Sequence, residues 1–207
     1  KEKTSSNTYG PGYSEYKAAS RDEALATVEL LLLNIPFQTG YSPKRWQKAL
    51  DVMLPKKKNC FEVSKLRTIG LQEADFNFFC KYLGRWAMKK AEDYGHLAKE
   101  QYGSRRRHTA IKQALNKRLT MDMAMLQRVS TVFCSQDAMS CYDRISHAAL
   151  ALGLRRQNIP DTAIEALITT IQNMVHKVRT TFGESALTYN GDLPLRPNQG
   201  IPQGNGM

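Results

Sequence analysis

The chain has 207 residues, of which 42% are hydrophobic and 24% charged, and its mean hydropathy is −0.49. This balance is typical of a folded globular protein with one domain or two small lobes, not of a disordered chain. The longest apolar stretch, residues 30–37, is much shorter than the roughly 20 residues that cross a bilayer, so we expect neither membrane insertion nor secretion. The cysteines lack the paired spacing of a zinc site and suggest no disulfide framework, which favours a reducing intracellular compartment, nucleus or cytoplasm; they are Cys60, Cys80, Cys134 and Cys141.

The positive charge is concentrated in one segment. Thirty Lys and Arg against nineteen Asp and Glu give a net charge of +11, and residues 41–128 alone hold twenty basic and eight acidic side chains, a net charge of +12. Such an excess is typical of a protein that binds a polyphosphate, because each neutralised phosphate releases condensed counterions. For a single run such as Lys56–Lys58, a solvated lysine-rich surface is the better interpretation, whereas the asymmetry of the whole segment favours a nucleic-acid partner.

In chain order, the first half of the sequence predicts loops, helices and one strand pair. Residues 1–20 are polar and predict a loop or frayed end. A helix is expected from Arg21 to Asn34, ended by Pro36, and a second short helix from Ser42 to Leu50. Two apolar stretches, 52–54 and 63–71, flank a basic, turn-prone loop and predict a strand–loop–strand excursion.

The second half predicts helices and further strands. Helical spacing of apolar residues indicates basic amphipathic helices over 73–100 and 111–126. Val129–Cys134 has the composition of a strand buried on both faces, with Asp137 just beyond its end. Helices over 148–156 and 161–176 and strands over 178–182 and 187–189 follow, before a glycine-rich turn at 200–206. Because the chain starts without methionine and stops just after this turn, we expect it to be a piece of a longer protein.

Asp137 is the first candidate for chemistry. A carboxylate at the end of a buried strand, together with the carbonyl of Ala138, offers oxygen ligands to a hard divalent cation such as Mg²⁺, or Mn²⁺ in its place. Two-metal phosphoryl transfer normally needs a second carboxylate, and Asp143 is the nearest one. In the alternative interpretation Asp137 simply ends the strand and Asp143 caps a helix that begins near Ile145.

Two motifs, at residues 137–143 and 200–204, resemble in type and order the palm of a reverse transcriptase of the kind encoded by non-LTR retrotransposons. In that family a strand ends in Asp-x4-aromatic-Asp, matched by Asp137, Tyr142 and Asp143, and a Gly-x-Pro-Gln-Gly turn follows, matched by Gly200–Gly204. Gly200 lies 63 positions after Asp137, which leaves room for the two helices and paired strands that the family places between the motifs.

The resemblance extends upstream and covers about residues 43–207. The family's fingers carry a Pro-Lys loop and then an Arg-containing strand, similar to Pro55-Lys56 and to Leu66–Leu71 with Arg67. A helix bearing Lys81 and the segment Gln101-Tyr-Gly103 also resemble family features. Thr68 stands where the family usually has proline, which loosens the correspondence of the fingers strand. The implied fold is α+β: mostly helical fingers with a short strand pair over 21–128, joined to a partial right-hand polymerase palm over 129–207, after a loop at 1–20.

The resemblance also implies roles for individual residues. Asp137 corresponds to the catalytic carboxylate, which binds metal together with Ala138, and Lys56 and Arg67 correspond to clamps on the incoming deoxynucleoside triphosphate. Tyr142 corresponds to the aromatic gate that excludes a ribose 2′-hydroxyl. Two residues of the glycine turn, Gln203 and Gly204, would lie against template and nucleotide, where a glycine allows close backbone approach.

The implied activity is RNA-directed DNA synthesis: deoxynucleotides are added to a DNA primer on an RNA template by two-magnesium phosphoryl transfer. The family's second catalytic pair, aromatic-x-Asp-Asp, is absent from these 207 residues, so we expect the piece alone to bind magnesium weakly and to be inactive. The competing hypothesis is a basic helical module that binds nucleic acid without catalysis. The four histidines have no mutual spacing that suggests a zinc site.

Overall fold

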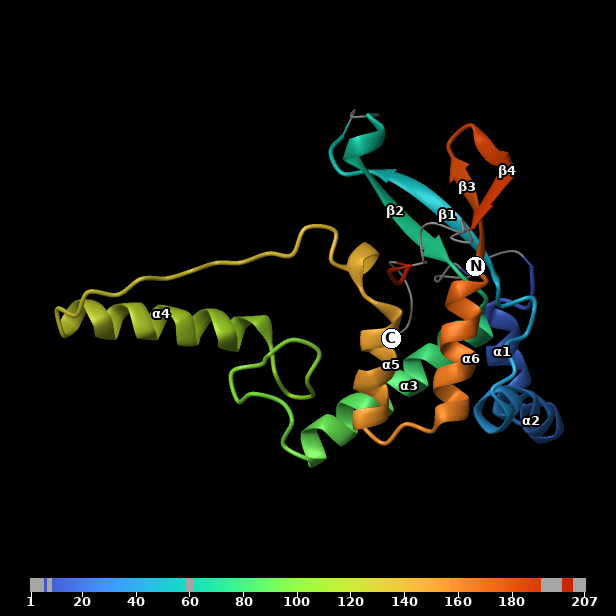
Figure 1. Ribbon diagram of the computed structural model, residues 1–207, viewed down its shortest axis with the longest axis horizontal. Coiled ribbons are helices and arrows are strands. Elements are labelled where there is room, and N and C mark those ends of the chain that lie inside the picture. The colour runs from blue at the N-terminus through green and yellow to red at the C-terminus, as the bar shows by residue number, and fades with distance from the viewer. Residues whose placement is uncertain (1–5, 7–8, 59–61, 191–198, 203–207) are drawn as a thin grey trace. The chain divides into compact units, whose positions relative to one another are not determined.

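The computed structural model describes residues 6, 9–58, 62–190 and 199–202 (Figure 1). Over these residues the protein is a mixed α+β structure with six α-helices and a four-stranded mixed sheet. It divides into two compact units, one formed by residues 1–87 and 140–207 and the other by residues 88–139. The first unit contains the whole sheet. None of the described helices is both long and apolar enough to cross a membrane.

The sheet of the first unit has the strand order β2-β1-β3-β4. Strands β1 (Lys48–Pro55) and β2 (Leu66–Leu71) form an antiparallel hairpin, which confirms the strand–loop–strand prediction. Strand β3 (Val175–Thr180) pairs with β1 in parallel, from Lys48↔Val175 to Val52↔Arg179. Strand β4 (Gly183–Asn190) pairs antiparallel with β3, with a register shift between Lys177 and Arg179.

Helices cover the sheet and build the hydrophobic core. Helix α3 (Ala74–Asp93) directly follows β2, and α5 (His147–Arg156) and α6 (Asp161–Gln172) precede β3. The expected two helices and strand pair between residues 137 and 200 are therefore present. The core gathers aromatic side chains from α3 and aliphatic ones from α6 around Trp46, with these buried members: Trp46, Ala49, Phe76, Phe79, Cys80, Leu83, Leu154, Ile159, Ala163, Ile164, Ala166, Leu167, Ile171 and Met174.

The N-terminal region contains more helix than the sequence predicts. Helix α1 (Tyr13–Ala19) lies inside the expected loop, and its start is closed by the Glu15 carboxylate, which accepts a hydrogen bond of 2.7 Å from the Gly12 amide. Helix α2 (Glu23–Thr39) begins at the N-cap Asp22 and runs through Pro36 to Gly40, which is left-handed with φ 75°. The prediction that Pro36 ends the helix is wrong. Pro36 is buried, and the Gly40 amide donates to its carbonyl, so the last turn is retained beyond the proline.

Two other predicted elements are wrong. Residues 42–50 form a turn, with the Trp46 amide bonded to the Pro43 carbonyl at 2.9 Å, and then enter β1, because strand pairing on both sides of β1 outweighs local helix signals. Val129–Cys134 forms no strand and is exposed, with Val132 at 88%. A strand needs ladder partners, and the ladders of the described residues join only β1–β2, β1–β3 and β3–β4.

The second unit is built around helix α4 (Ala110–Leu126). The Thr109 side chain caps its start by accepting from the Lys112 amide at 3.3 Å. Arg105 holds the preceding loop through Glu92 at 3.2 Å and through two backbone carbonyls. Apolar side chains on α4 remain exposed, including Ile111 at 81% and Leu126 at 83%. Burial inside this unit therefore contributes little to the stability of α4.

Candidate nucleic-acid and nucleotide interface

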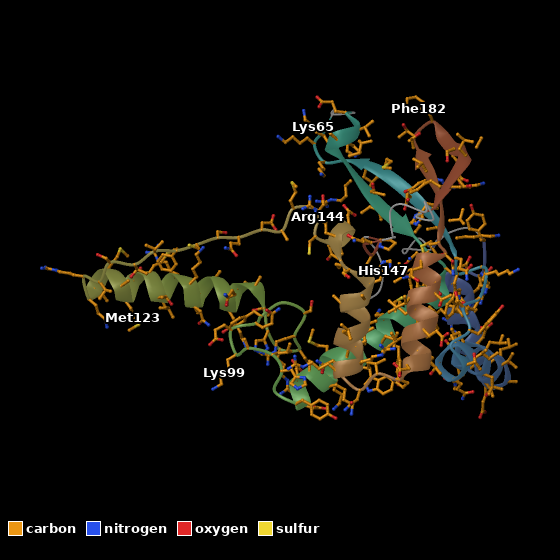
Figure 2. The ribbon with its side chains drawn as sticks, in the orientation of Figure 1. Lys65, Lys99, Met123, Arg144, His147 and Phe182 are labelled. Carbon is orange, nitrogen blue, oxygen red and sulfur yellow. The ribbon has the colours of Figure 1, made fainter. Side chains whose placement is uncertain are left out.

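The free end of the β1–β2 hairpin carries a group of cations. The Lys56 amide bonds to the Lys65 carbonyl at 3.1 Å, one position beyond the Pro55↔Leu66 pair and two beyond Leu54↔Arg67. Arg67 belongs to β2, whereas Lys56 follows the last residue of β1 and Lys65 ends the short 3₁₀ turn Val63–Lys65 that leads into β2. The three cations therefore lie together at the free end of the hairpin. All three are exposed, and Figure 2 shows Lys65 at the outer end of the hairpin. The structure thus brings the two predicted triphosphate clamps, Lys56 and Arg67, to one end of the sheet.

Strand β3 adds two cations on the face of the sheet that carries Arg67. The parallel register places Lys177 opposite Leu50 and Arg179 opposite Val52, and Leu50 and Val52 alternate in phase with Leu54. Arg179 is ion-paired with Glu184 of β4, whereas Lys65 is paired with Glu62 at 2.8 Å. We call this set, Lys56, Lys65, Arg67, Lys177 and Arg179, the cationic face. Its charges come from β2, from β3 and from the connection between β1 and β2, and a group of cations of this kind attracts a phosphate backbone.

The glycine turn is docked onto the residues that follow Asp137 in the sequence. The Gly200 amide donates to the Ile145 carbonyl at 2.8 Å, and the Ile201 amide donates to the Tyr142 carbonyl at 2.8 Å. Gly200 has φ 97°, and a Cβ there would lie 2.8 Å from the Cα of Asp143. Only glycine fits this approach without a shift of the backbone. The Tyr142–Asp143 half of the first motif and the start of the second motif are therefore in direct contact.

His147 fixes the same junction, although no pattern in the sequence assigns it a role. It is the first residue of α5, capped by Ser146, and its side chain is buried. Its Nε2 lies 2.8 Å from the Gly200 carbonyl oxygen. Since a carbonyl only accepts, Nε2 carries the proton, and Nδ1 has no hydrogen-bond partner among the described residues. Figure 2 shows Arg144 on the short segment that leads into α5 and His147 at the start of this helix. A lone histidine at a helix start offers no sequence signal of such a contact.

The remaining predicted site residues are placed as follows. Tyr142 begins a short 3₁₀ turn (Tyr142–Arg144), and its side chain is 52% exposed. Asp137 and Ala138 are exposed and belong to the unit of residues 88–139. Gln203 and Gly204 lie outside the described residues. Within the described ranges no three His, Cys, Asp or Glu side chains are grouped so as to hold a metal ion. The roles of these residues stay predictions.

A buried polar cluster lies on the opposite face of the sheet. Asp51 of β1 is 3% exposed, and its Oδ2 accepts from Nδ1 of His176 at 2.9 Å and from the Tyr189 hydroxyl. The His176 and Tyr189 rings stack at 5.1 Å between centroids. Burial, and then the hydrogen bond to Asp51, raise the pKa of the Tyr189 phenol. A charged residue inside an apolar strand is a sequence signal for such a cluster, but its partners depend on the β1–β3 register.

Comparison with protein-family models gives no match, and no curated protein matches the sequence. The two motifs and their contact are therefore the basis for assigning a function. The class of protein that the structure itself defines is a mixed α+β protein with a cationic sheet face and a docked glycine turn.

Proposed function

We propose that this chain is the fingers and part of the palm of a reverse transcriptase, and that its cationic face binds the RNA template, the DNA primer and the triphosphate of the incoming deoxynucleotide. The observation that carries the proposal is the contact between Tyr142–Asp143 and Gly200–Ile201. Each motif alone has little specificity. The two meet through two backbone hydrogen bonds, and the backbone of Gly200 lies so close to Asp143 that only glycine fits there. A chance pair of motifs would not be expected to meet in this way.

The cationic face supports the same proposal independently. Lys56 and Arg67, chosen by resemblance alone, lie at the free end of one hairpin, and β3 adds Lys177 and Arg179 on the face that carries Arg67. A hybrid of RNA and DNA carries a phosphate on every nucleotide, so several cations on one face would contact several phosphates. In the proposed enzyme Mg²⁺, or Mn²⁺ in its place, would supply the charge stabilisation for phosphoryl transfer, with Asp137 and the Ala138 carbonyl as ligands.

The alternative is a non-catalytic nucleic-acid-binding module. The observation that favours it is the absence of a grouped metal-ligand set among residues 6, 9–58, 62–190 and 199–202. The two candidates share the electrostatic prediction and differ in chemistry. A test therefore needs one arm for binding and one for chemistry.

In the binding arm, the affinity for an RNA·DNA hybrid is measured against salt concentration by fluorescence anisotropy. The triple variant Lys56→Gln, Lys65→Gln, Arg67→Gln should bind more weakly and reduce the slope of log K against log[salt] by about 3, roughly one unit for each phosphate that the variant no longer neutralises. The control is Lys17→Gln, Arg21→Gln, Lys44→Gln, which removes the same charge from exposed positions elsewhere. Equal slopes for the two variants would contradict the assignment of the cationic face.

In the chemical arm, primer extension is measured with the chain joined to a segment that carries an aromatic-x-Asp-Asp turn. Asp137→Asn should abolish extension, and Tyr142→Val should admit ribonucleotides, because a smaller side chain leaves room for the 2′-hydroxyl. Extension that is insensitive to Asp137→Asn would contradict the catalytic role of Asp137. Hybrid binding without any extension would favour the alternative.

A further inference from the structure

Helix α2 exposes an apolar strip that no part of the described chain covers. Its main residues are spaced four, three and four positions apart: Ala24, Val28, Leu31 and Ile35. Leu25 and Leu32 lie beside them on the helix. The exposed fractions are 53% for Val28, 64% for Leu31 and 43% for Ile35, with 55% for Leu25 and 53% for Leu32. We call this set the α2 strip: Ala24, Leu25, Val28, Leu31, Leu32 and Ile35. Monomeric proteins seldom expose a contiguous apolar surface of this kind without a partner.

Another side of α2 packs on the protein, although Leu30, which is not part of the strip, is also 59% exposed. Phe37 packs on Phe79 with 4.4 Å between ring centroids, and its carbonyl accepts from the Thr162 hydroxyl at 2.6 Å. Pro36 is buried. The helix is therefore fixed from one side by α3 and α6, and the strip presents a rigid apolar surface rather than a frayed segment.

Charge restricts what can cover the strip. Helix α2 contains Glu23 and Glu29 and no Lys or Arg, whereas α1, α3, α4 and α5 all carry basic residues. In a chain of net charge +11, two copies repel each other at most surfaces. Helix α2 itself brings no cations to such a contact, and the exposed Arg21 just precedes its N-cap Asp22. An anionic membrane would instead need basic residues beside the strip, and α2 offers none.

The spacing and the charges also fix the mode of pairing. Apolar residues at four-three-four spacing interdigitate with the same pattern on a facing helix. In a parallel pair the acidic starts of both helices, Asp22 and Glu23, would lie side by side. In an antiparallel pair each acidic start faces the uncharged end of its partner, Gln38 and Thr39, and the helix dipoles oppose each other.

We propose that the chain forms a twofold-symmetric dimer through the α2 strip, with the two α2 helices antiparallel and the Val28–Leu31 region next to the symmetry axis. Such an interface is isologous, so each copy contributes the same surface. In Figure 1, α2 lies at the end of the first unit away from the β1–β2 hairpin, so the cationic face remains open in the dimer. The proposal does not depend on the proposed function.

The test is the molar mass in solution, measured by sedimentation velocity and light scattering over a range of concentrations. The unaltered chain should approach twice 23.4 kDa as concentration rises, and Leu31→Glu should stay at 23.4 kDa. The control is Leu152→Glu on α5, because Leu152 is 65% exposed, close to the 64% of Leu31. It should still dimerise. Circular dichroism should show that both variants keep the helical content of the unaltered chain.

A charge-pairing arm separates the interface from effects on folding. Leu31→Glu and Leu31→Lys chains should each be monomeric alone and should form a mixed dimer when combined, because opposite charges then meet near the axis. A monomer at all concentrations up to about 100 µM, the range in which weak specific dimers form, would overturn the proposal. So would equal dimerisation of the Leu31→Glu and Leu152→Glu variants. The affinity of Leu31→Glu for the RNA·DNA hybrid should equal that of the unaltered chain, so this result does not depend on whether the proposed function is correct.

Discussion

Asp51 shows how a single residue ties the sheet together. Its carboxylate is buried in the middle of β1, and each of its two side-chain partners comes from a different strand, His176 from β3 and Tyr189 from β4. A buried carboxylate is costly unless its lone pairs accept hydrogen bonds. The cluster therefore favours the one register in which all three residues meet, and it stabilises the strands whose other face carries Lys177 and Arg179.

Tyr189→Phe should lower stability at neutral pH by about 1 kcal/mol, because it removes one donor to the buried carboxylate. The raised pKa of Tyr189 also sets the alkaline behaviour. The folded state keeps a phenol proton that the unfolded chain loses above pH about 10, so the contribution is complete below that pH and is lost as the pH rises. Urea unfolding at several pH values should therefore show a shallower alkaline decline for Tyr189→Phe.

The control for this residue is Tyr41→Phe, which removes an exposed phenol from the loop after α2. It should leave both the neutral stability and the alkaline decline unchanged. If the two variants behave alike, the Asp51 cluster makes no net contribution.

At the scale of the elements, the position of the docked glycine turn depends on the close contact between the backbones of Gly200 and Asp143. Gly200→Ala would place a methyl group 2.8 Å from the Cα of Asp143 at a φ of 97°. We expect a loss of about 1–3 kcal/mol from strain and overpacking, together with faster hydrogen exchange at the Ile201 amide. Gly183→Ala separates the two causes, because Gly183 also has a positive φ, 127°, but a Cβ there meets nothing within 4 Å. Equal losses would show that the contact with Asp143 is not tight.

At the scale of the whole molecule, the two units differ in how well they bury their backbone. In the second unit α4 has no buried residue, and residues 128–138 are exposed and belong to no strand of the described sheet. Backbone of this kind is cut first by proteases. Brief trypsin digestion followed by mass spectrometry should give first cuts within residues 99–128, while Lys48 and Lys177, inside the sheet, are cut late. Early cleavage at Lys177 would mean that the sheet opens readily.

The sequence predicts those parts of the fold that depend on local signals. The basic loop between two apolar stretches indicates the β1–β2 hairpin, and apolar spacing indicates α6, which ends at Gln172 and not at His176. Long-range pairing decides the rest. Trp46–Leu50 has local helix signals but lies at the start of a strand with partners on both sides, and Val129–Cys134 has the composition of a strand but no partner among the described strands.

The candidate site follows the same division. Lys56 and Arg67 are predictable by resemblance and lie together because one hairpin carries both. His147, Lys177 and Arg179 are not predictable, because their positions depend on contacts with Gly200 and on the register with β1. The Asp137 prediction assumes a buried strand before it, and that assumption is wrong.

The parallel ladder between residues 48–52 and 175–179 has a consequence for biosynthesis. A ribosome releases the hairpin of β1 and β2 long before it releases β3, and an isolated two-stranded ribbon is at best marginally stable in water. The nascent chain must therefore hold or re-form that ribbon until more than a hundred further residues have emerged, which makes folding slow and non-local. Conditions that delay translation between these two segments should expose the nascent chain to aggregation.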